Sequence, residues 1–256
     1  MSDYLEKFEK MRVAGNLAAR TLDMLTDNIK PGITTDHIDK LGYEFIRDNG
    51  GYSAPLYYRG FKKSLCTSLN HVVCHGIPSD RILNEGDSIN VDVTAIVNNH
   101  YGDTSRMYCV GKTSVKANNL INVTYDSMMK GIKILKPGIK LGDIGNTIQS
   151  YVEENSFSVV RDFCGHGIST SFHEPPNILH YGKKNTGIKL VPGMTFTIEP
   201  MINSAKYAVK VLKDGWTAVT KDKSLSAQFE HTIGINENGY EIFTKSVKGY
   251  SKPPYL

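Results

Sequence analysis

Two histidines and four carboxylates in this sequence are of the residue types that bind metal ions. His166 and His173 lie seven positions apart in residues 160–176, and glycines flank His166 on both sides. With a strand over residues 160–163, His166 would lie just past the end of that strand. Glycine lets the backbone approach a ligand closely. Seven extended residues reach ~24 Å, so the two imidazoles share a site only if the chain folds back. On its own, this spacing favours two unrelated loop histidines.

Two of the carboxylates are expected on one β-hairpin. Alternation of apolar and polar residues predicts a strand over residues 88–97, with Asp92 on its polar face, and a return strand that carries Asp103. A hairpin centred between Val97 and Asn98 would place the two acids directly opposite each other, with Cβ atoms ~4.5–5.5 Å apart. Acids so placed repel each other unless a cation or a proton intervenes.

The other two carboxylates, Glu199 and Glu230, are expected on strands over residues 194–200 and 226–235. Burial of an unpaired carboxylate is costly, and among the basic residues only Arg106 lies close to the acids in sequence. Four acids with one imidazole therefore indicate a site for two divalent ions, for which Mn, Fe, Co or Zn is suitable. Two such ions ~3.5–4 Å apart would hold a bridging hydroxide as nucleophile and polarise a carbonyl. A single ion would leave at least one acid without a role.

His75 and His173 remain as candidates for hydrogen bonds to a substrate amide or to an oxyanion. The alternative is that each is a capping or core histidine. A cysteine nucleophile beside a histidine is a further alternative, either Cys74 with His75 or Cys164 with His166. Neighbours on a strand point to opposite faces, which disfavours the first of these pairs.

The elements that must position these residues show a repeated pattern. Apolar residues at a 3.6 period predict helices over residues 3–29, 35–49, 115–135 and 141–155. The letters Lys-Pro-Gly-Ile stand at residues 30–33 and again at 136–139, each time between two predicted helices. Residues 85–92 and 192–199 match in pattern at almost the same offset. Two matches at one offset indicate an internal repeat.

We therefore expect a single domain over residues 1–256, built from two similar halves, about 1–112 and 113–248, that share one sheet. Asp92 and Glu199 would occupy equivalent positions, one in each half.

The composition is that of an ordinary globular chain. Of its 256 residues, 40% are hydrophobic and 22% are charged, and the net charge is +4. The basic residues are scattered, which argues against specific nucleic-acid binding. No apolar run approaches the ~20 residues of a membrane helix, and the charged first residues do not resemble a secretory signal. Four cysteines without a Cys-x-x-Cys pair are typical of a reduced, cytoplasmic protein.

Seven motifs, in order along nearly the whole chain, resemble the signatures of type I methionine aminopeptidases, the bacterial and organellar form within metallopeptidase family M24. They are Cys-His-Gly-Ile-Pro at 74–78, Asp-Val-Thr at 92–94, Gly-Asp-Thr-Ser-Arg at 102–106, Gly-His-Gly-Ile at 165–168, Phe-His-Glu-Pro at 172–175, Phe-Thr-Ile-Glu-Pro-Met at 196–201 and Ala-Gln-Phe-Glu-His-Thr at 227–232.

The resemblance implies an α+β pita-bread fold, in which helices lie outside a curved antiparallel sheet. It implies that two divalent ions, Co, Mn, Fe or Zn, are held by Asp92, Asp103, His166, Glu199 and Glu230. Asp103 and Glu230 would bridge the ions, and Glu199 would also carry protons for the attacking water.

The resemblance also implies substrate contacts. His173 would contact the scissile peptide and steady the tetrahedral intermediate, and His75 would hydrogen-bond the substrate backbone. The family's methionine pocket falls on Tyr58, Phe61, Cys66, Phe172 and Trp216, an apolar set suited to a thioether. A monovalent ion is expected near Asn70, Val72 and Ser226.

Three departures from the family pattern bear on substrate preference and rate. Arg59 stands where bacterial relatives usually have histidine, and Phe61 stands where many have tyrosine. Residues 169–171, Ser-Thr-Ser, replace a more glycine-rich stretch.

The implied activity is removal of the initiator methionine from nascent polypeptides when the second residue is small, in the cytoplasm and at the ribosome. We expect a monomer without a membrane partner. Two alternatives keep the fold. One is a proline-specific aminopeptidase or dipeptidase, which usually carries an added N-terminal domain. The other is a non-catalytic pita-bread binding protein, which typically lacks metal ligands.

Overall fold

The structure, a computed structural model, describes residues 4–255 and has an α+β architecture. The helices are α1 (Tyr4–Leu25), α2 (Thr35–Asp48), α3 (Val115–Lys133) and α4 (Leu141–Glu154), with a short 3₁₀ turn at Tyr58–Gly60. Each of the four predicted helices is present. The first ends four residues early, at Leu25, and its expected start at residue 3 lies outside the described residues.

Side chains at the N-terminal ends explain where two of these helices begin. The hydroxyl of Thr34 accepts a hydrogen bond from the amide of His37 at the start of α2. The hydroxyl of Ser114 accepts one from the amide of Ala117 at the start of α3. Both contacts satisfy amides that have no partner within the first helical turn.

The strands form four antiparallel sheets. The strands are β1 (Tyr52–Ser53), β2 (Cys66–Leu69), β3 (Val72–Cys74), β4 (Ser88–Val97), β5 (His100–Cys109), β6 (Ser158–Val159), β7 (Gly165–Gly167), β8 (Glu174–Ile178), β9 (Thr195–Ile198), β10 (Met201–Asn203), β11 (Val209–Val211), β12 (Ala218–Thr220), β13 (Ser226–Gln228), β14 (His231–Asn236) and β15 (Gly239–Ile242).

One large sheet has the order β1-β4-β2 with β5 paired to β4, and the other has the order β15-β14-β9-β7-β8. Two smaller sheets are β13-β10-β6 and β11-β12-β3. The single shared sheet expected from the repeat is therefore divided. An isolated antiparallel bridge between Ser105 and Glu230 connects the two large sheets at their common border.

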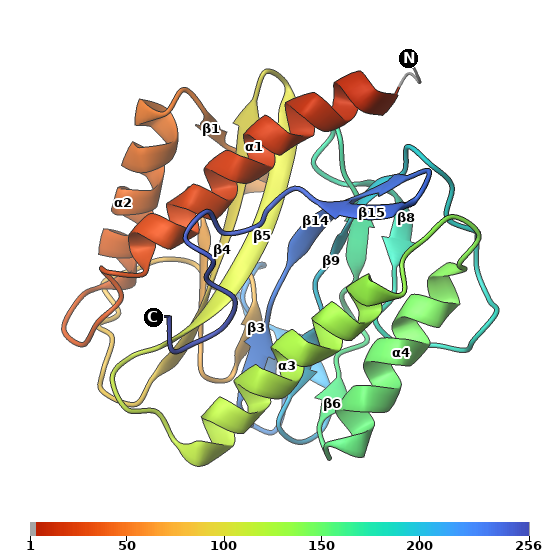
Figure 1. The fold of residues 1–256 in the computed structure, drawn as a ribbon. Coiled ribbons are helices and arrows are strands. Elements are labelled where there is room, and N and C mark those ends of the chain that lie inside the picture. Colours follow the sequence, from red (N-terminus) through yellow and green to blue (C-terminus); the bar gives the residue numbers. More distant parts are fainter. Residues whose placement is uncertain (1–3, 256) are drawn as a thin grey trace.

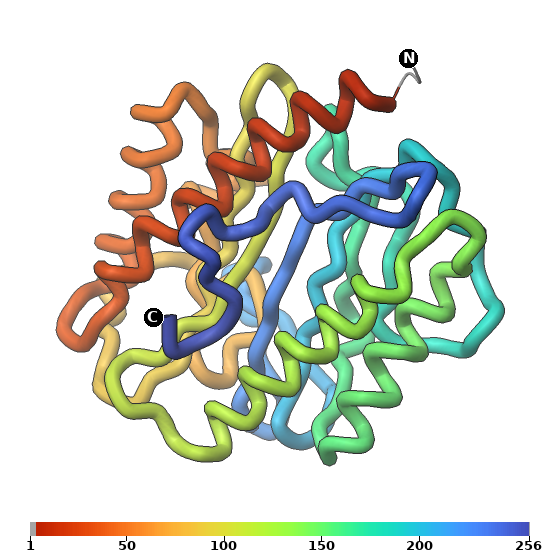
Figure 2. Tube along the Cα trace, in the orientation of Figure 1, coloured from red at the N-terminus to blue at the C-terminus, as the bar shows by residue number. Residues whose placement is uncertain are grey.

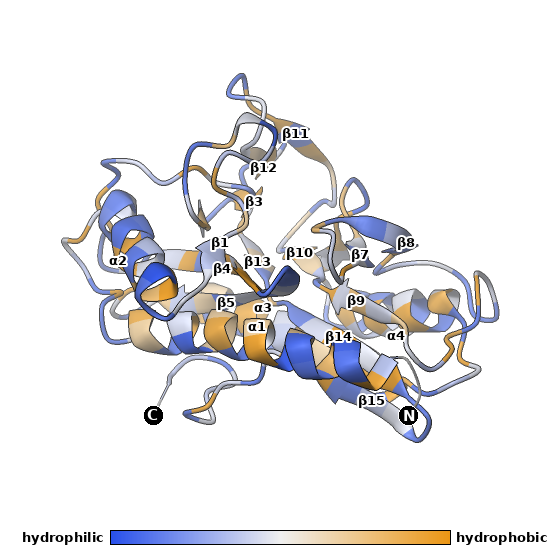
Figure 3. Ribbon diagram, turned by 90° about the horizontal axis from the view of Figure 1, so that it is seen from above, coloured by the Kyte–Doolittle hydropathy of each residue, from blue (hydrophilic) through white to orange (hydrophobic). Residues whose placement is uncertain are grey.

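The helices form two pairs, with α1, α3 and α4 on one side of the sheets and α2 at the edge, in contact with α1 and β1. Figure 1 shows α1 and α2 beside β4 and β5, and α3 and α4 beside β6, β9 and β14. Seen from above in Figure 3, α1, α3 and α4 run along one side of the molecule, and β3, β11 and β12 lie on the opposite side. The strands between these layers can therefore present polar side chains away from the helices.

Each helix pair packs on its own apolar core. Leu22 of α1 and Ile38 of α2 are buried with Val91 of β4 in one cluster. Ile132 of α3 and Ile198 of β9 are buried in a second cluster. Because the apolar faces of the strands point to the helices, the polar faces of the two large sheets are left to line the site.

The β4–β5 hairpin differs from the predicted register. Val97 pairs with His100, so Asn98 and Asn99 form the turn, and both have positive φ, at 48° and 60°. Two consecutive left-handed residues are typical of a type I′ turn, for which asparagine is well suited. The hairpin centre is therefore one residue later than predicted.

This shift changes the relation between the two acids of the hairpin. Asp92 lies opposite Ser105, and Asp103 lies opposite Thr94. The two carboxylates are diagonal neighbours, not direct partners, and the expected opposition was wrong.

The C-terminal segment returns to α1 and β5. In Figure 2 it is the dark blue tube that passes beside the red helix α1. Asp23 of α1 is buried, pairs with Arg106 and accepts hydrogen bonds from Ser246 and from the amides of Val247 and Lys248. Among residues 4–255, no helix combines the length and apolarity that crossing a bilayer requires.

Candidate metal centre

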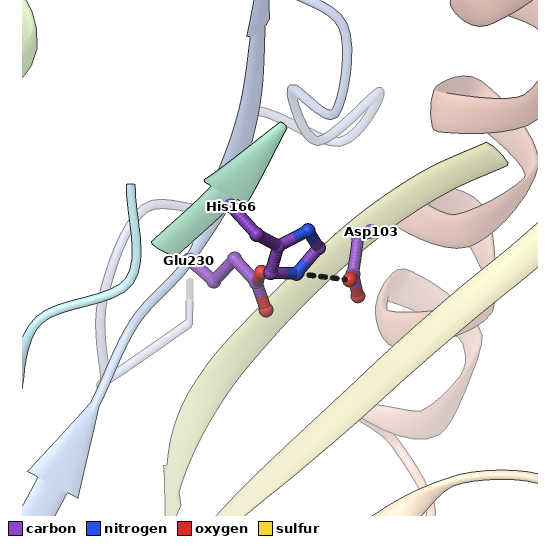
Figure 4. A group of neighbouring side chains, drawn as sticks. All are labelled: Asp103, His166 and Glu230. Carbon is purple, nitrogen blue, oxygen red and sulfur yellow. Dashed lines mark ion pairs between the residues drawn. The ribbon is translucent and has the colours of Figure 1, made fainter. Parts of the chain in front are cut away.

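A cavity of about 370 Å³ opens between the two large sheets. All the acids and histidines that the sequence proposed for the site line it: Asp92, Asp103, Glu199, Glu230, His75, His166 and His173. Three of them come closest. One ligand atom from each of Asp103, His166 and Glu230 lies within 4.8 Å of the others. Figure 4 shows these three side chains converging from β5, β7 and the segment between β13 and β14.

His166 lies within strand β7, whereas the prediction placed it just after a strand over residues 160–163. The flanking residues Gly165 and Gly167 explain the strand. A Cβ atom on Gly165 would collide with the carbonyl of Thr197, and one on Gly167 would collide with the carbonyl of Pro175. The glycines therefore let β7 pack tightly between its neighbours, which fixes the backbone of His166.

The imidazole of His166 is oriented for ligation through Nε2. Its Nδ1 lies 3.0 Å from the carbonyl oxygen of Gly167, to which an N–H at Nδ1 donates. In the neutral ring, the lone pair then lies on Nε2. Nε2 is 3.6 Å from Oδ2 of Asp103 and 3.6 Å from Oε1 of Glu199.

Hydroxyl and amide donors hold the carboxylates. Thr94 donates to Oδ1 of Asp103 at 2.7 Å, and Thr197 donates to Oε1 of Glu199 at 2.7 Å. Gln228 donates to Oε2 of Glu199 at 3.3 Å. Each carboxylate keeps further acceptor capacity, because an ionised carboxylate offers about four lone-pair sites.

Burial and mutual repulsion raise the pKa values of three of the acids. Burial raises the pKa of Glu230 well above its usual value, and the charges of Asp103, Glu199 and Asp92 add to the effect. The pKa of Asp92 is also well above its usual value, first through burial and then through Asp103 and Glu199. Burial raises the pKa of Glu199 to about 7, although the charge of His166 opposes this.

His166 responds to the same acids in the opposite sense. Burial lowers its pKa, but the hydrogen bond to Asp103 and the charges of Glu199 and Asp103 raise the pKa to about 9. Without another cation, the imidazolium is therefore the positive charge nearest to the four carboxylates. One positive charge does not balance four acids, so repulsion among the acids adds to burial in raising their pKa values.

The donor set fits divalent ions. The oxygen of the acids and one imidazole nitrogen are ligands that Mn, Fe, Co and Zn accept. Asp92 supplies a specific observation, because its Oδ1 is shielded from solvent and has no hydrogen-bond partner among residues 4–255. Asp92 and Glu199 line the same cavity as the group of three. Arg106 does not compensate these acids, since it pairs with Asp23.

His75 and His173 lie on two sides of the cavity. His75 has a positive φ of 56°, and its ring meets Trp216 edge-on with centroids 6.1 Å apart. Nδ1 of His173 lies 3.1 Å from the hydroxyl of Tyr58. Burial lowers the pKa of His75. Burial and then the charge of His166 lower the pKa of His173 to about 4, so both rings are neutral at pH 7.

The five residues expected to bind methionine line the same cavity. The rings of Phe61 and Trp216 meet edge-on with centroids 5.1 Å apart, and the rings of Tyr58 and Phe172 are 4.9 Å apart. Cys66 is buried beside the acids, and burial and the charge of Asp92 raise the pKa of its thiol well above the usual value. A thiol in that state is an apolar wall and not a nucleophile.

Several supporting residues were not identified from the sequence. Thr94 and Thr197 lie on the predicted polar faces of their strands, so alternation could have indicated them. Gln228 and His180 gave no such signal. The amide of Glu199 donates to Nε2 of His180 at 3.0 Å, and His180 is fully buried, which lowers its pKa to about 3.

Comparisons with known proteins show the family of the chain. Residues 9–237 match the family model described as metallopeptidase family M24. Methionine aminopeptidase from Rickettsia prowazekii is 57% identical over 249 residues, which cover 97% of this chain and 96% of that protein. Methionine aminopeptidase from Salmonella typhimurium is 53% identical and covers 93% of this chain and 91% of its own length.

The fold is also similar to those of solved structures. The crystal structure of methionine aminopeptidase from Rickettsia prowazekii has a TM-score of 0.93 at 57% identity, with 93% of this chain and 97% of that chain covered. Prolidase from Pyrococcus furiosus, at 21% identity and a TM-score of 0.76, is similar in fold alone, and 64% of its chain is covered. The expected α+β pita-bread fold is thereby confirmed. The chain belongs to metallopeptidase family M24 and, within that family, to the bacterial-type methionine aminopeptidases.

Proposed function

We propose that this protein hydrolyses the peptide bond that follows an N-terminal methionine when the second residue of the polypeptide is small. The observation that carries the proposal is that the metal-binding side chains and the apolar side chains line the same cavity. Metal-type donors from both large sheets and an apolar, aromatic wall border the same 370 Å³ space. The wall suits an unbranched thioether side chain, and the donors suit the chemistry at its carbonyl group.

Five residues would hold two divalent ions: Asp92, Asp103, His166, Glu199 and Glu230. The family resemblance implies that Asp103 and Glu230 would serve both ions, and both lie in the close group with His166. When bound, two divalent cations supply the positive charge that makes a water molecule nucleophilic near neutral pH and polarises the peptide carbonyl.

Glu199 would carry the protons of the reaction. Its carboxylate is oriented by Thr197 and Gln228, and without metal burial raises its pKa to about 7. A carboxylate held at this position would accept the proton of the attacking water and donate it to the departing amine.

The two neutral histidines would bind the peptide that is cleaved. If the hydroxyl of Tyr58 donates to Nδ1 of His173, Nε2–H of His173 faces the cavity as a donor. That donor would stabilise the negative charge that develops on the carbonyl oxygen. His75, on the Trp216 side, would hydrogen-bond the substrate backbone.

The proposal also covers the natural substrates, the oligomeric state and a monovalent ion. The substrates would be N-termini of nascent polypeptides in the cytoplasm, including chains still on the ribosome, and the enzyme would act as a monomer. A monovalent ion is proposed beside Asn70, Val72 and Ser226. Asn70 has a positive φ of 52°, and its carbonyl accepts the amide of Ser226 at 2.8 Å, which brings these segments together.

Hydrolysis of Met-Ala-Ser and of Ala-Pro-Ala by protein loaded with Mn or Co tests the proposal. We expect release of methionine from the first peptide and no cleavage of the second. Cleavage of Ala-Pro-Ala alone would favour the proline-specific enzyme. Cleavage of neither peptide by a metal-loaded sample would favour the binding protein.

A further inference from the structure

The loop that borders the cavity between β1 and β2 has an unusual backbone. Tyr57 and Arg59 both have positive φ, at 66° and 47°, although neither is glycine. The amide of Tyr57 donates to the carbonyl of Phe61 at 2.7 Å, which closes the loop on itself. Left-handed residues are costly outside glycine, so the closed loop must hold Arg59 in its place.

Arg59 lies on the His173 side of the cavity mouth. Its guanidinium carbon is 5.2 Å from the centroid of the Tyr58 ring, and the hydroxyl of Tyr58 reaches His173. Arg59 lines the cavity and its side chain is exposed. The stacking on Tyr58 orients the guanidinium without using its N–H donors.

Within residues 4–255, Arg59 forms no ion pair and no side-chain hydrogen bond, although most other arginines at the surface pair with an anion or with an amide oxygen. Arg12 pairs with Glu241, and Arg47 pairs with Asp48. Asp162 also lines the cavity, next in sequence to Phe163, whose ring meets that of His75, and it forms no ion pair with Arg59. Five donors of Arg59 are therefore available to a ligand at the mouth.

The path of an extended substrate through the cavity indicates which of its side chains would reach Arg59. On the proposed function, the methionine side chain fills the apolar wall and the second residue is small. An extended peptide advances ~3.3 Å per residue, so the third residue lies ~7 Å beyond the first. Its side chain is the first of unrestricted size to reach the mouth, where a carboxylate would meet the fork of donors that guanidinium offers.

We propose that Arg59 forms a subsite for an acidic side chain at the third residue of the substrate, an inference that rests on the function proposed above. Asp162, which also lines the cavity, would repel an acid that turns toward it. The subsite therefore favours carboxylate over neutral and basic side chains in one orientation.

The test compares Met-Ala-Asp-Ser, Met-Ala-Asn-Ser and Met-Ala-Lys-Ser, hydrolysed by the Mn-loaded enzyme at low ionic strength. We expect kcat/KM to be about 3- to 5-fold higher for the Asp peptide than for the Asn peptide, with the Lys peptide lowest, as is typical of an exposed ion pair. Raising the salt to about 0.5 M should bring the ratios close to one, because exposed charges are then screened.

Variants assign the effect to Arg59. Arg59→Gln should remove the difference between the Asp and Lys peptides, and Arg59→Glu should reverse it. Arg47→Gln removes one positive charge from the exposed face of α2, at a residue that does not line the cavity. It should leave the order of kcat/KM among the three peptides unchanged. Equal kcat/KM for the three peptides, or an Asp preference that survives Arg59→Gln, would overturn the inference.

Measurements of peptide binding distinguish a failure of this inference from a failure of the proposed function. Dissociation constants of the three peptides are measured by calorimetry on the Mn-loaded Glu199→Gln variant, with and without Arg59→Gln. Charge-ordered binding that depends on Arg59, without hydrolysis by the parent enzyme, would support the subsite and reject the proposed activity. Hydrolysis with no charge order in kinetics or binding would reject the subsite and retain the activity.

Discussion

The hydroxyl of Tyr58 lies 3.1 Å from Nδ1 of His173, so one hydrogen bond holds the imidazole of His173 against the phenol. Tyr58 comes from the loop after β1, and His173 comes from the segment after β7. The pair therefore joins two segments that are far apart in sequence, beside the place where the peptide would be cleaved.

Replacing Tyr58 with Phe should lower kcat by about 2- to 10-fold, the value of one hydrogen bond, while KM changes less because the aromatic ring remains. Steady-state kinetics on Met-Ala-Ser measures both constants. Tyr57→Phe is the matched control, since Tyr57 is 74% exposed and should give wild-type kinetics. An unchanged kcat in Tyr58→Phe would show that the phenol does not position His173.

Replacing His173 with Ala should lower kcat by ~10²–10³, as expected when a donor to the developing oxyanion is lost. Metal content should stay at the wild-type value, because His173 is not among the proposed ligands. Retention of full kcat would remove His173 from the mechanism.

Glu199→Gln should abolish turnover and leave the fold intact, because the amide cannot carry the proton that the carboxylate carries. Circular dichroism and the elution volume monitor the fold, and single-turnover assays with excess enzyme monitor the chemistry. Gln228→Ala is the companion variant, since it removes one hydrogen bond to Glu199 at 3.3 Å and should cost activity without abolishing it. Full activity of Glu199→Gln would refute the assignment.

The metal-free protein should lose stability between pH 6.5 and pH 9. The folded state holds a proton on His166 up to a pKa of about 9, whereas the unfolded chain releases it near 6.5. The folded state therefore binds more protons in this window, and stability falls as the pH rises. Thermal unfolding in EDTA measures the slope.

Two controls accompany that measurement. Asp103→Asn removes the hydrogen bond and charge that raise the pKa of His166, so its slope should be smaller. Added Mn should stabilise the wild type more at pH 8.5 than at pH 6.5, because ligands must lose protons to bind a metal. A metal-free stability that rises from pH 6.5 to pH 9 would contradict the electrostatic description of the site.

Arg106→Met should destabilise the protein by about 3–5 kcal/mol, because Asp23 would be left buried without its cation. Both side chains are 3% exposed. Arg12→Met is the control, since its partner Glu241 lies at the surface and such pairs contribute about 0–1 kcal/mol. Urea unfolding of both variants gives the comparison, and equal losses would show that burial does not set the cost.

Much of the fold could be predicted from local pattern. The four helices follow from apolar periodicity, and the two Lys-Pro-Gly-Ile breaks mark where the second helix of each pair begins. Alternation placed Asp92 and Thr94 on the polar face of β4, and the same face now borders the cavity. These features depend on neighbours in sequence, which is why sequence alone was sufficient.

Features that depend on distant partners were predicted less well. The hairpin centre was wrong by one residue because the turn type of Asn98 and Asn99 sets the register. His166 was placed after a strand because the strand exists only through its packing between β8 and β9. The equivalence of the two halves stays a prediction, as do the roles of the five ligands.

The border bridge between Ser105 and Glu230 has a consequence for the apoprotein. Donors on either side of that bridge belong to different sheets with separate apolar cores, and hydrogen bonds between Asp103 and Thr232 also cross the border. Neither sheet can complete the cation site by itself, so the affinity for the ion depends on the relative position of the two sheets. A cation bound there would act as a cross-link between them, and chelation would loosen the molecule first along that border.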